Sequence, residues 1–308
     1  MAARSPVTWR AILLLGAYVV LFPPLFVLGP LAGLLVASRP RTLREWAWIG
    51  AAALWLGVSL WQPGGLAAQM LHAWALFVTG AFVVLMLSGG APLVPGALLA
   101  TVFGLGAATA WTWWLGTRWQ EIQLAVAHTG WDFCRQLLDQ GGLTPERMEA
   151  LRLYVGALSD GVAVMAELFP GLLVLSALPG LALAWTWYHR IAAQPAGRPA
   201  QRFGEFSFSD QLIWLVVACM VALVIPLPAP VNALAGNLAV VVGGLYAARG
   251  AAILSGTLDG FPVPVLLVIL VGVLFVLPVA LGGCFALGLA DTWVDFRRRY
   301  AVADQRGE

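Results

Sequence analysis

The sequence predicts an all-α membrane protein, a polytopic transmembrane helix bundle with about 8 membrane segments, some of them short or broken at prolines. Between Glu45 and Arg118 the chain contains no Asp, Glu, Lys or Arg, and this run is long enough for three membrane-crossing helices. A soluble helix keeps one polar face toward water, so an uncharged run of this length indicates that lipid surrounds the helices. Of all residues, 61% are hydrophobic and 10% are charged, which leaves no room for a sizeable soluble domain. We therefore expect a single transmembrane domain over residues 1–308.

The first apolar run, residues 11–38, is too long for one regular span and contains three prolines. It is either one kinked helix or two short helices that meet near Pro23 and Pro24. Basic residues flank it on both sides: Arg4, Arg10, Arg39, Arg41 and Arg44. The positive-inside rule places both flanks in the cytoplasm, which a hairpin of two short helices satisfies, although about 13 residues give only about 20 Å of helix. No cleavage site of small residues follows the run, so we expect it to be retained.

Three further spans are predicted at about 46–62, 70–88 and 93–116, before a segment of different character. Residues 118–152 mix charges of both signs and predict an amphipathic helical hairpin insertion outside the membrane core. The apolar face of its first helix contains Trp119, Ile122, Val126, Phe133 and Leu137. The turn is expected at 140–142, after which Thr144 caps a second helix that begins at Pro145. The apolar positions of this second helix are Met148, Leu151, Val155 and Leu158. Counting spans from a cytoplasmic N-terminus places the hairpin on the outer side.

The second helix of the hairpin is expected to continue through 153–188 as a span kinked at Pro170 and Pro179. Residues 189–209 then form a cytoplasmic loop that contains four basic or histidine side chains. Further spans are predicted at about 211–225 and 231–254, with a proline-rich turn between them.

The last apolar run, 262–290, is interrupted by Pro278 and leads into a polar C-terminal tail, 291–308, with arginines at 297–299. A single final span would place these arginines outside, and a pair of short helices would place them inside. We favour the cytoplasmic side.

Composition and missing motifs exclude several classes of protein. The net charge of +2 argues against nucleic acid as a partner. Cys134, Cys219 and Cys284 are far apart and lack the spacing of a metal site. No GxxxxGK[ST], HExxH or GxSxG occurs, so neither a P-loop nor a zinc protease nor a serine hydrolase is expected. We predict no enzyme activity, no catalytic residue, no cofactor and no metal.

Polar residues inside predicted spans are candidates for ligand binding, because burying them in hydrocarbon is costly. These candidates are Asp160, Glu167, Asn237, Tyr246 and Arg249. Asp160 and Glu167 lie seven positions apart on nearly one helix face, where two carboxylates would suit a cation or proton coupling. Glu167 and Arg249 could also form an ion pair. Asn237, Tyr246 and Arg249 are expected along one side of their helix. The structural alternatives are that Arg249 extends to the headgroups, that Asp160 ends the hairpin and that Asn237 bonds a neighbouring helix.

Two local features have sufficient structural explanations. Asp210 precedes the span that begins at Gln211 and is expected to cap that helix. Gly29 and Gly33 form a GxxxG pattern, and the pairs at 243–244 and 282–283 suggest further close helix contacts.

Three segments near the C-terminus carry a resemblance to a known family. They are Phe206-Ser-Phe-Ser-Asp210-Gln-Leu-Ile-Trp214, the segment from Asn237 through Tyr246 to Gly250, and Gly288-Leu-Ala-Asp291-Thr-Trp293-Val-Asp295-Phe296-Arg297-Arg298-Arg299. Together they resemble the YybS-like family of bacterial integral membrane proteins. That family is similar in outline to the substrate-binding subunits of energy-coupling-factor transporters, a likeness at the level of fold.

Two functions follow as hypotheses for a multi-pass protein of the bacterial cytoplasmic (inner) membrane. The first is a transporter-like protein that binds a small-molecule solute without catalysis, with an ATPase as a partner. The alternative is a structural or scaffold protein of the cell envelope, in which the hairpin binds an envelope protein.

Overall fold

The computed structural model describes residues 24–61, 65–88, 92–139, 145–257 and 261–294. Within these ranges the regular structure is helical and contains no strand. The fold class is therefore confirmed. The chain divides into two compact units, Met1–Ala200 and Gln201–Glu308, which are described separately. The expected first half of the 11–38 run, the turn at 140–142 with Thr144, and residues 295–308 of the tail lie outside the described residues.

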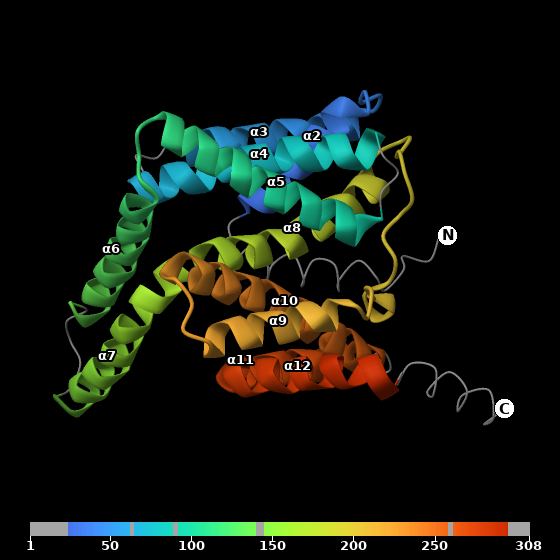
Figure 1. Ribbon diagram of the computed structural model, residues 1–308. Helices are drawn as coiled ribbons and strands as arrows, with labels where there is room; N and C mark the ends of the chain where they lie inside the picture. Colours follow the sequence, from blue (N-terminus) through green and yellow to red (C-terminus); the bar gives the residue numbers. More distant parts are fainter. Residues whose placement is uncertain (1–23, 62–64, 89–91, 140–144, 258–260, 295–308) are drawn as a thin grey trace. The chain divides into compact units, whose positions relative to one another are not determined.

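Unit 1 contains seven described helices. They are α2 (Leu25–Ala37), α3 (Leu43–Trp61), α4 (Leu66–Ser88), α5 (Leu93–Trp114), α6 (Trp119–Leu138), α7 (Pro145–Glu167) and α8 (Phe169–Ile191). Helix α2 packs against α3, α4 and α8, while α5 covers α4 and α8 (Figure 1). Large apolar side chains fill the space between them, including Phe26, Trp74, Phe82 and Trp185, all of which are fully buried. Helices α4, α5 and α8 are long and apolar enough to cross a membrane.

Glycines on α2 allow it to approach α4 closely. A Cβ atom added at Gly29 would lie 3.1 Å from Oγ1 of Thr79, and one at Gly33 would lie 2.9 Å from Cγ2 of Val83. The GxxxG pattern is therefore a helix contact, as the sequence predicted. Helix α2 has 13 residues and contains Pro30. The first half of the 11–38 run lies outside the described residues, so the choice between one kinked helix and two short ones stays a prediction.

The segment expected to be one helix over 153–188 is two helices. Helix α7 ends at Glu167 and α8 begins at Phe169, with Leu168 between them and Pro170 in the first turn of α8. Proline lacks a backbone N–H and is tolerated in a first turn, so Pro170 starts a helix here instead of kinking one. The candidate span is thus Phe169–Ile191.

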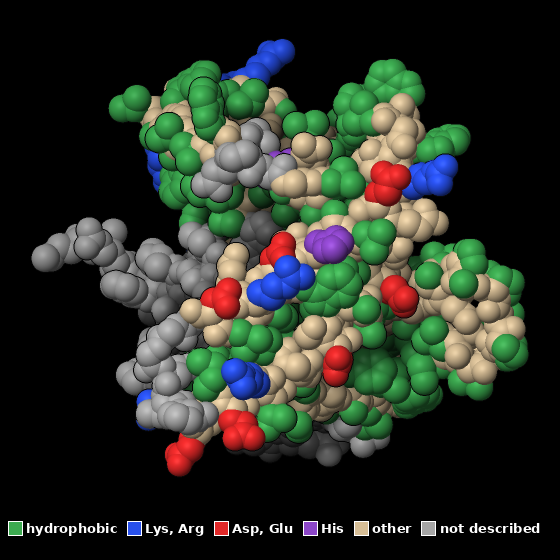
Figure 2. Space-filling view, turned by 90° about the vertical axis from the view of Figure 1, so that its left-hand side faces the viewer, with side chains coloured by type: hydrophobic (Ala, Val, Ile, Leu, Met, Phe, Trp, Pro, Cys, Tyr) green, Lys and Arg blue, Asp and Glu red, His purple; other side chains and the backbone are tan. Residues whose placement is uncertain are grey.

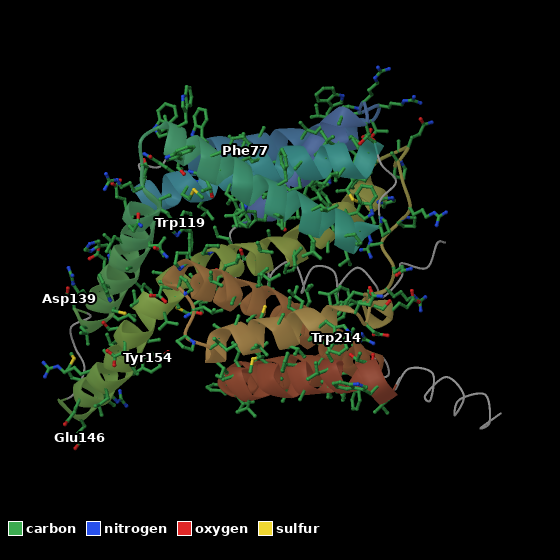
Figure 3. The ribbon with its side chains drawn as sticks, in the orientation of Figure 1. Phe77, Trp119, Asp139, Glu146, Tyr154 and Trp214 are labelled. Atoms are coloured by element: carbon green, nitrogen blue, oxygen red, sulfur yellow. The ribbon has the colours of Figure 1, made fainter. Side chains whose placement is uncertain are left out.

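Helices α6 and α7 pack against each other as the predicted hairpin. Their shared core consists of Ala127, Cys134, Val155, Val162 and Ala166. The expected face of α6 was partly wrong, because Phe133 is largely exposed and its neighbour Cys134 is buried. The charged side chains Asp139 and Glu146 lie at the tip of the hairpin, and Trp119 lies at its base (Figure 3). Viewed from the side where the hairpin lies, side chains of both charges are interspersed with hydrophobic ones (Figure 2).

Glu45 connects the start of α3 to the end of α8. Its Oε2 accepts hydrogen bonds from the backbone N–H of Arg41 at 2.8 Å and of Thr42 at 2.7 Å, and from the Thr42 hydroxyl at 2.8 Å. The Glu45 N–H donates back to the Thr42 hydroxyl at 3.3 Å, so Thr42 and Glu45 form a capping box. Its other oxygen, Oε1, accepts the N–H of Ala193 at 2.8 Å. One carboxylate thus fixes two segments that lie 148 residues apart.

The two ends of unit 1 therefore differ. The starts of α3 and α5 and the ends of α4 and α8 lie at one end, where the Trp185 indole donates to the carbonyl of Arg198 at 3.0 Å. The hairpin follows the far end of α5 and lies at the opposite end of the unit (Figure 1). Which end faces the cytoplasm stays a prediction.

Unit 2 contains η1 (Phe203–Glu205), α9 (Leu212–Val224), α10 (Ala229–Thr257), α11 (Val263–Phe275) and α12 (Leu277–Val294). Helix α10 packs against both α9 and α12. The last apolar run is broken as one of the two alternatives expected, but the break lies at Val276, and Pro278 occupies the first turn of α12. Helix α12 extends to Val294, so Asp291 belongs to this helix and not to the C-terminal tail.

The hydrogen bonds to Glu45 give a prediction about acid stability. They lower the pKa of this carboxyl from 4.5 to about 2, with the Ala193 N–H as the largest cause, followed by Arg41 and Thr42. A pKa lowered by folding adds stability that is complete above the unfolded value and is lost as the pH falls through the folded value. The wild-type protein should therefore melt above Glu45→Gln at pH 7, and this difference should shrink between pH 4.5 and 2. Thermal melts in detergent measure it, and a difference that does not depend on pH would contradict it.

Candidate functional site

Arg249 is the centre of a charged cluster inside unit 2. Its residue is 7% exposed, on a helix that is otherwise almost entirely apolar. The Nε–H donates to Oδ2 of Asp291 at 2.9 Å, and NH1 donates to Oδ1 of Asp210 at 2.7 Å. One guanidinium is thus held between two carboxylates from different segments.

The two carboxylates have different environments. Asp291 lies on α12 and is 3% exposed, so it forms a buried neutral pair with Arg249. The Asp210 side chain is 63% exposed and comes from the turn that precedes α9. Breaking a buried ion pair by removing one partner costs far more stability than breaking an exposed ion pair. Asp291 is therefore the fixed partner of Arg249, and Asp210 is the exchangeable one.

Aromatic rings surround the cluster on one side. The Phe208 ring lies with its centroid 5.4 Å from the Arg249 guanidinium carbon, a cation–π contact. Tyr246, one turn before Arg249, packs edge-to-face on Phe208 at 5.0 Å and on Phe285 of α12 at 6.3 Å. These rings shield the guanidinium from competing solvent and hold the segment before α9 against α10.

A close crossing of α10 and α12 brings Asp291 to Arg249. A Cβ atom added at Gly250 would collide with the Cys284 carbonyl, and one at Gly288 would collide with the Tyr246 carbonyl. Only glycine permits this backbone approach. The close contacts predicted at Gly243 and at 282–283 are absent, since Cβ atoms at Gly243, Gly282 and Gly283 would meet nothing within 4 Å.

Two hydroxyl groups beside the cluster are buried without a hydrogen-bond partner in the described part of the chain. They belong to Tyr246 and to Thr292, which follows Asp291 on α12. The two groups lie close to each other. A buried unpaired hydroxyl costs free energy, so the site retains capacity for polar contacts.

The cluster also fixes the course of the chain through unit 2. Asp210 directly precedes α9 and Asp291 lies three residues before the end of α12, yet both bond the same guanidinium. The start of α9 and the end of α12 therefore lie at the same end of the helices of unit 2.

The structure brings together only part of the residues predicted as a site. Tyr246 and Arg249 share the cluster. Asn237 donates to the carbonyl of Ala233 in its own helix at 2.8 Å. Nine residues are two and a half helical turns, so Asn237 and Tyr246 lie on opposite sides of α10, contrary to the expected alignment.

The two acidic candidates lie in unit 1. Asp160 and Glu167 are exposed on α7, and Glu167 is its last residue, before the candidate span and not inside it. Within unit 2 the ion-pair partners of Arg249 are Asp210 and Asp291. Glu167 belongs to unit 1, so its pairing with Arg249 stays a prediction.

Two members of the cluster were missed from the sequence. Asp210 was expected to cap α9, but that helix has no side-chain cap, and the carboxylate binds Arg249 instead. Asp291 was assigned to the tail. The signal that could have found them is that Asp210, Arg249 and Asp291 lie in the three segments that carried the family resemblance.

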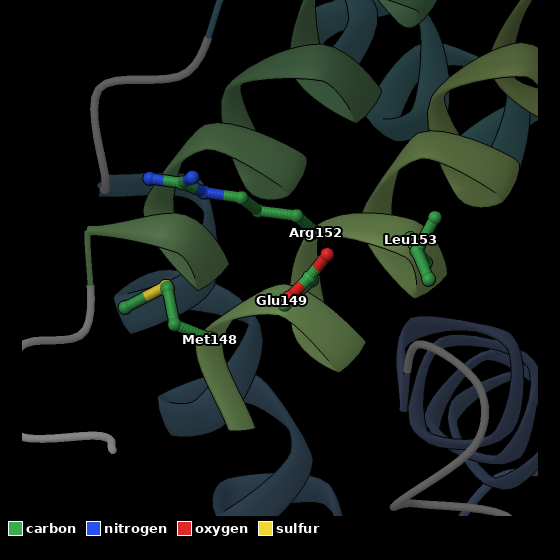
Figure 4. A pocket seen from close by; sticks show the side chains of 4 residues that line it. All are labelled: Met148, Glu149, Arg152 and Leu153. Atoms are coloured by element: carbon green, nitrogen blue, oxygen red, sulfur yellow. The ribbon is translucent and has the colours of Figure 1, made fainter. Parts of the chain in front are cut away.

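Other parts of the described structure give weaker candidates for a binding site. A surface pocket on α7 is lined by Met148, Glu149, Arg152 and Leu153 (Figure 4). Three of these four side chains are exposed, and none belongs to the predicted ligand set. Among the described residues, no group of His, Cys, Asp or Glu side chains is arranged to hold a metal ion.

The buried ion pair gives a prediction about stability. Arg249→Ala removes the guanidinium from the buried Asp291 carboxylate and should destabilise the protein by about 3–5 kcal/mol. The double variant Arg249→Met/Asp291→Leu removes both charges at similar volume and should recover most of that loss. Asp210→Asn should cost less than about 1 kcal/mol, because that partner is exposed. Denaturant unfolding in micelles measures all three, and equal losses in the single and double variants would contradict the pairing.

Comparison with known proteins gives a family and no closer relative. No curated protein and no solved structure matches the chain. One family model, described as a predicted membrane protein (DUF2232), matches residues 10–292. This match spans both units and includes Asp210, Arg249 and Asp291. The chain therefore belongs to the DUF2232 family of predicted membrane proteins.

Proposed function

We propose that this protein is a transporter-like membrane protein that binds a small molecule at the Arg249 cluster and has no catalytic activity of its own. The observation that carries the proposal is the cluster itself, in which Arg249 and Asp291 are buried among the apolar helices of unit 2 and Asp210 reaches them from the turn before α9. Charged groups at such positions are costly and usually serve a ligand or ion. Unpaired hydroxyl groups beside them add capacity for polar contacts.

Short helices support the same function. Helices α2, α9 and α11 have 13 residues each, about 20 Å of helix, which is less than the thickness of the hydrocarbon core. Helices that end within the membrane expose backbone groups to ligands in many transporters. The resemblance to the YybS-like family, and in outline to the substrate-binding subunits of energy-coupling-factor transporters, adds an ATPase as the expected partner.

The proposed location is the bacterial cytoplasmic membrane, with the 189–209 loop and the C-terminus inside and the hairpin outside. Arginines at 190, 198, 202 and 297–299 support this orientation through the positive-inside rule.

Cysteine labelling tests the orientation. In a cysteine-free background, Glu146→Cys should react with an impermeant maleimide added to intact spheroplasts, and Arg198→Cys should react only after lysis. A cysteine at Ala303 should behave like position 198. Labelling of 198 from outside would overturn the topology.

A ligand screen tests the function. The purified protein should melt at a higher temperature with one class among vitamins, amino acids and cations, because a ligand that binds only the native state stabilises it. The double variant Arg249→Met/Asp291→Leu should lose this response while remaining folded. Asp160→Asn and Glu167→Gln, on the exposed surface of α7, are matched controls that should retain it. A silent screen together with an unchanged solute profile in a deletion strain would refute transport.

A scaffold protein of the cell envelope is the second candidate, favoured by the hairpin. Phe133, Leu153 and Tyr154 are large, apolar and exposed there, as expected of a surface that binds another protein. In that case, crosslinking in the membrane should recover one reproducible partner, and deletion of 118–152 should release it. The same deletion should leave ligand stabilisation unchanged if the transporter function is correct.

A further inference from the structure

The guanidinium of Arg249 has donors that the described structure does not use. Arginine carries five N–H donors, and two are bonded here, one on Nε and one on NH1. Within the described residues NH2 makes no hydrogen bond, and it is not fully buried. NH2 therefore has two donors that the described residues do not use. The neighbouring Tyr246 and Thr292 hydroxyls can donate as well.

The guanidinium only donates, whereas the two hydroxyl groups can both donate and accept. A site made of N–H and O–H donors requires acceptor oxygens, and guanidinium matches the geometry of carboxylate and phosphate in particular. A protonated amine would find no acceptor on the guanidinium and would have to bind the second oxygen of Asp210. The unused guanidinium donors thus favour an oxyanion.

Asp210 already occupies the position that an oxyanion would take. It reaches Arg249 from a turn outside the helices, its side chain is mostly exposed, and it uses one oxygen for a single hydrogen bond. Asp291 keeps Arg249 neutralised from the buried side. Exchange of Asp210 for another carboxylate or phosphate group therefore leaves the charge around Arg249 unchanged, whereas addition of an anion beside both aspartates would raise the negative charge.

We propose that the Arg249 site takes an oxyanion, a carboxylate or phosphate group, which displaces Asp210 from the guanidinium. This inference rests on the proposed function and specifies its ligand class. Displacement removes the Asp210 bond, one of the contacts that hold the segment Phe203–Asp210 against α10, while the packing of η1 and the Phe208 contact stay in place.

The test compares Asp210→Asn with wild type. Purified full-length protein in detergent is titrated with inorganic phosphate, with succinate and with ethanolamine, and the melting temperature is followed. Asp210→Asn removes the internal competitor and should raise the apparent affinity for phosphate or succinate about tenfold. The matched control Glu205→Gln changes an exposed carboxylate of the same segment and should leave the affinity unchanged. Arg249→Met/Asp291→Leu should bind neither anion.

A second arm identifies the source of the oxyanion. The same variants are reconstituted in vesicles of phosphatidylcholine with and without phosphatidylglycerol. Stabilisation of Asp210→Asn by phosphatidylglycerol alone assigns the site to a lipid headgroup, and stabilisation by soluble anions assigns it to a solute. Either result supports the inference.

Two results would overturn it. If ethanolamine stabilises the protein and Asp210→Asn abolishes this effect, the site takes cations, so the ligand class is wrong while the proposed binding function survives. If Asp210→Asn binds no anion in either arm, the exchange does not occur. When the broader ligand screen is silent too, the proposed function fails with it.

Discussion

A guanidinium group among apolar helices must have a carboxylate beside it, and the structure of unit 2 follows from this requirement. Asp291 reaches Arg249 only because α12 crosses α10 in close contact, and that contact requires glycine at positions 250 and 288. The same guanidinium fixes the turn before α9 through Asp210. Three segments are thus held in register by one side chain, while the apolar surface of α9 and α12 is left to the lipid.

Unit 1 uses a comparable arrangement with the opposite charge. The Glu45 carboxylate lies where the chain enters α3, and it accepts hydrogen bonds from its own capping residue and from the segment after α8. In both units a polar side chain near a helix end joins parts of the chain that are distant in sequence. Apolar packing in a bilayer has little directional preference, so such bonds specify which helix ends lie together.

The fold class could be predicted from the sequence because a run without charged residues, long enough for three spans, indicates that lipid surrounds the helices. The approximate positions of the helices could also be predicted, since prolines, glycines and arginines separate the apolar runs from one another. The helix boundary at Leu168 was missed, because Pro170 is equally compatible with a kink inside a helix and with the first turn of a new one. Asp210 and Asp291 were missed for a different reason. Each had a sufficient local explanation, as a cap and as part of a tail, and their common partner becomes evident only when α10 and α12 are packed together.

The shared position of Asp210 and Asp291 at one end of unit 2 has a consequence for how the membrane protein is assembled. A unit that enters and leaves on the same side adds an even number of crossings, so its insertion or loss leaves the sidedness of everything that follows it unchanged. A unit like residues 201–308 could therefore be placed between two other segments without changing the side on which the second one lies. A segment with an odd number of crossings could not be exchanged in this way, because every following loop would be moved to the other side of the bilayer.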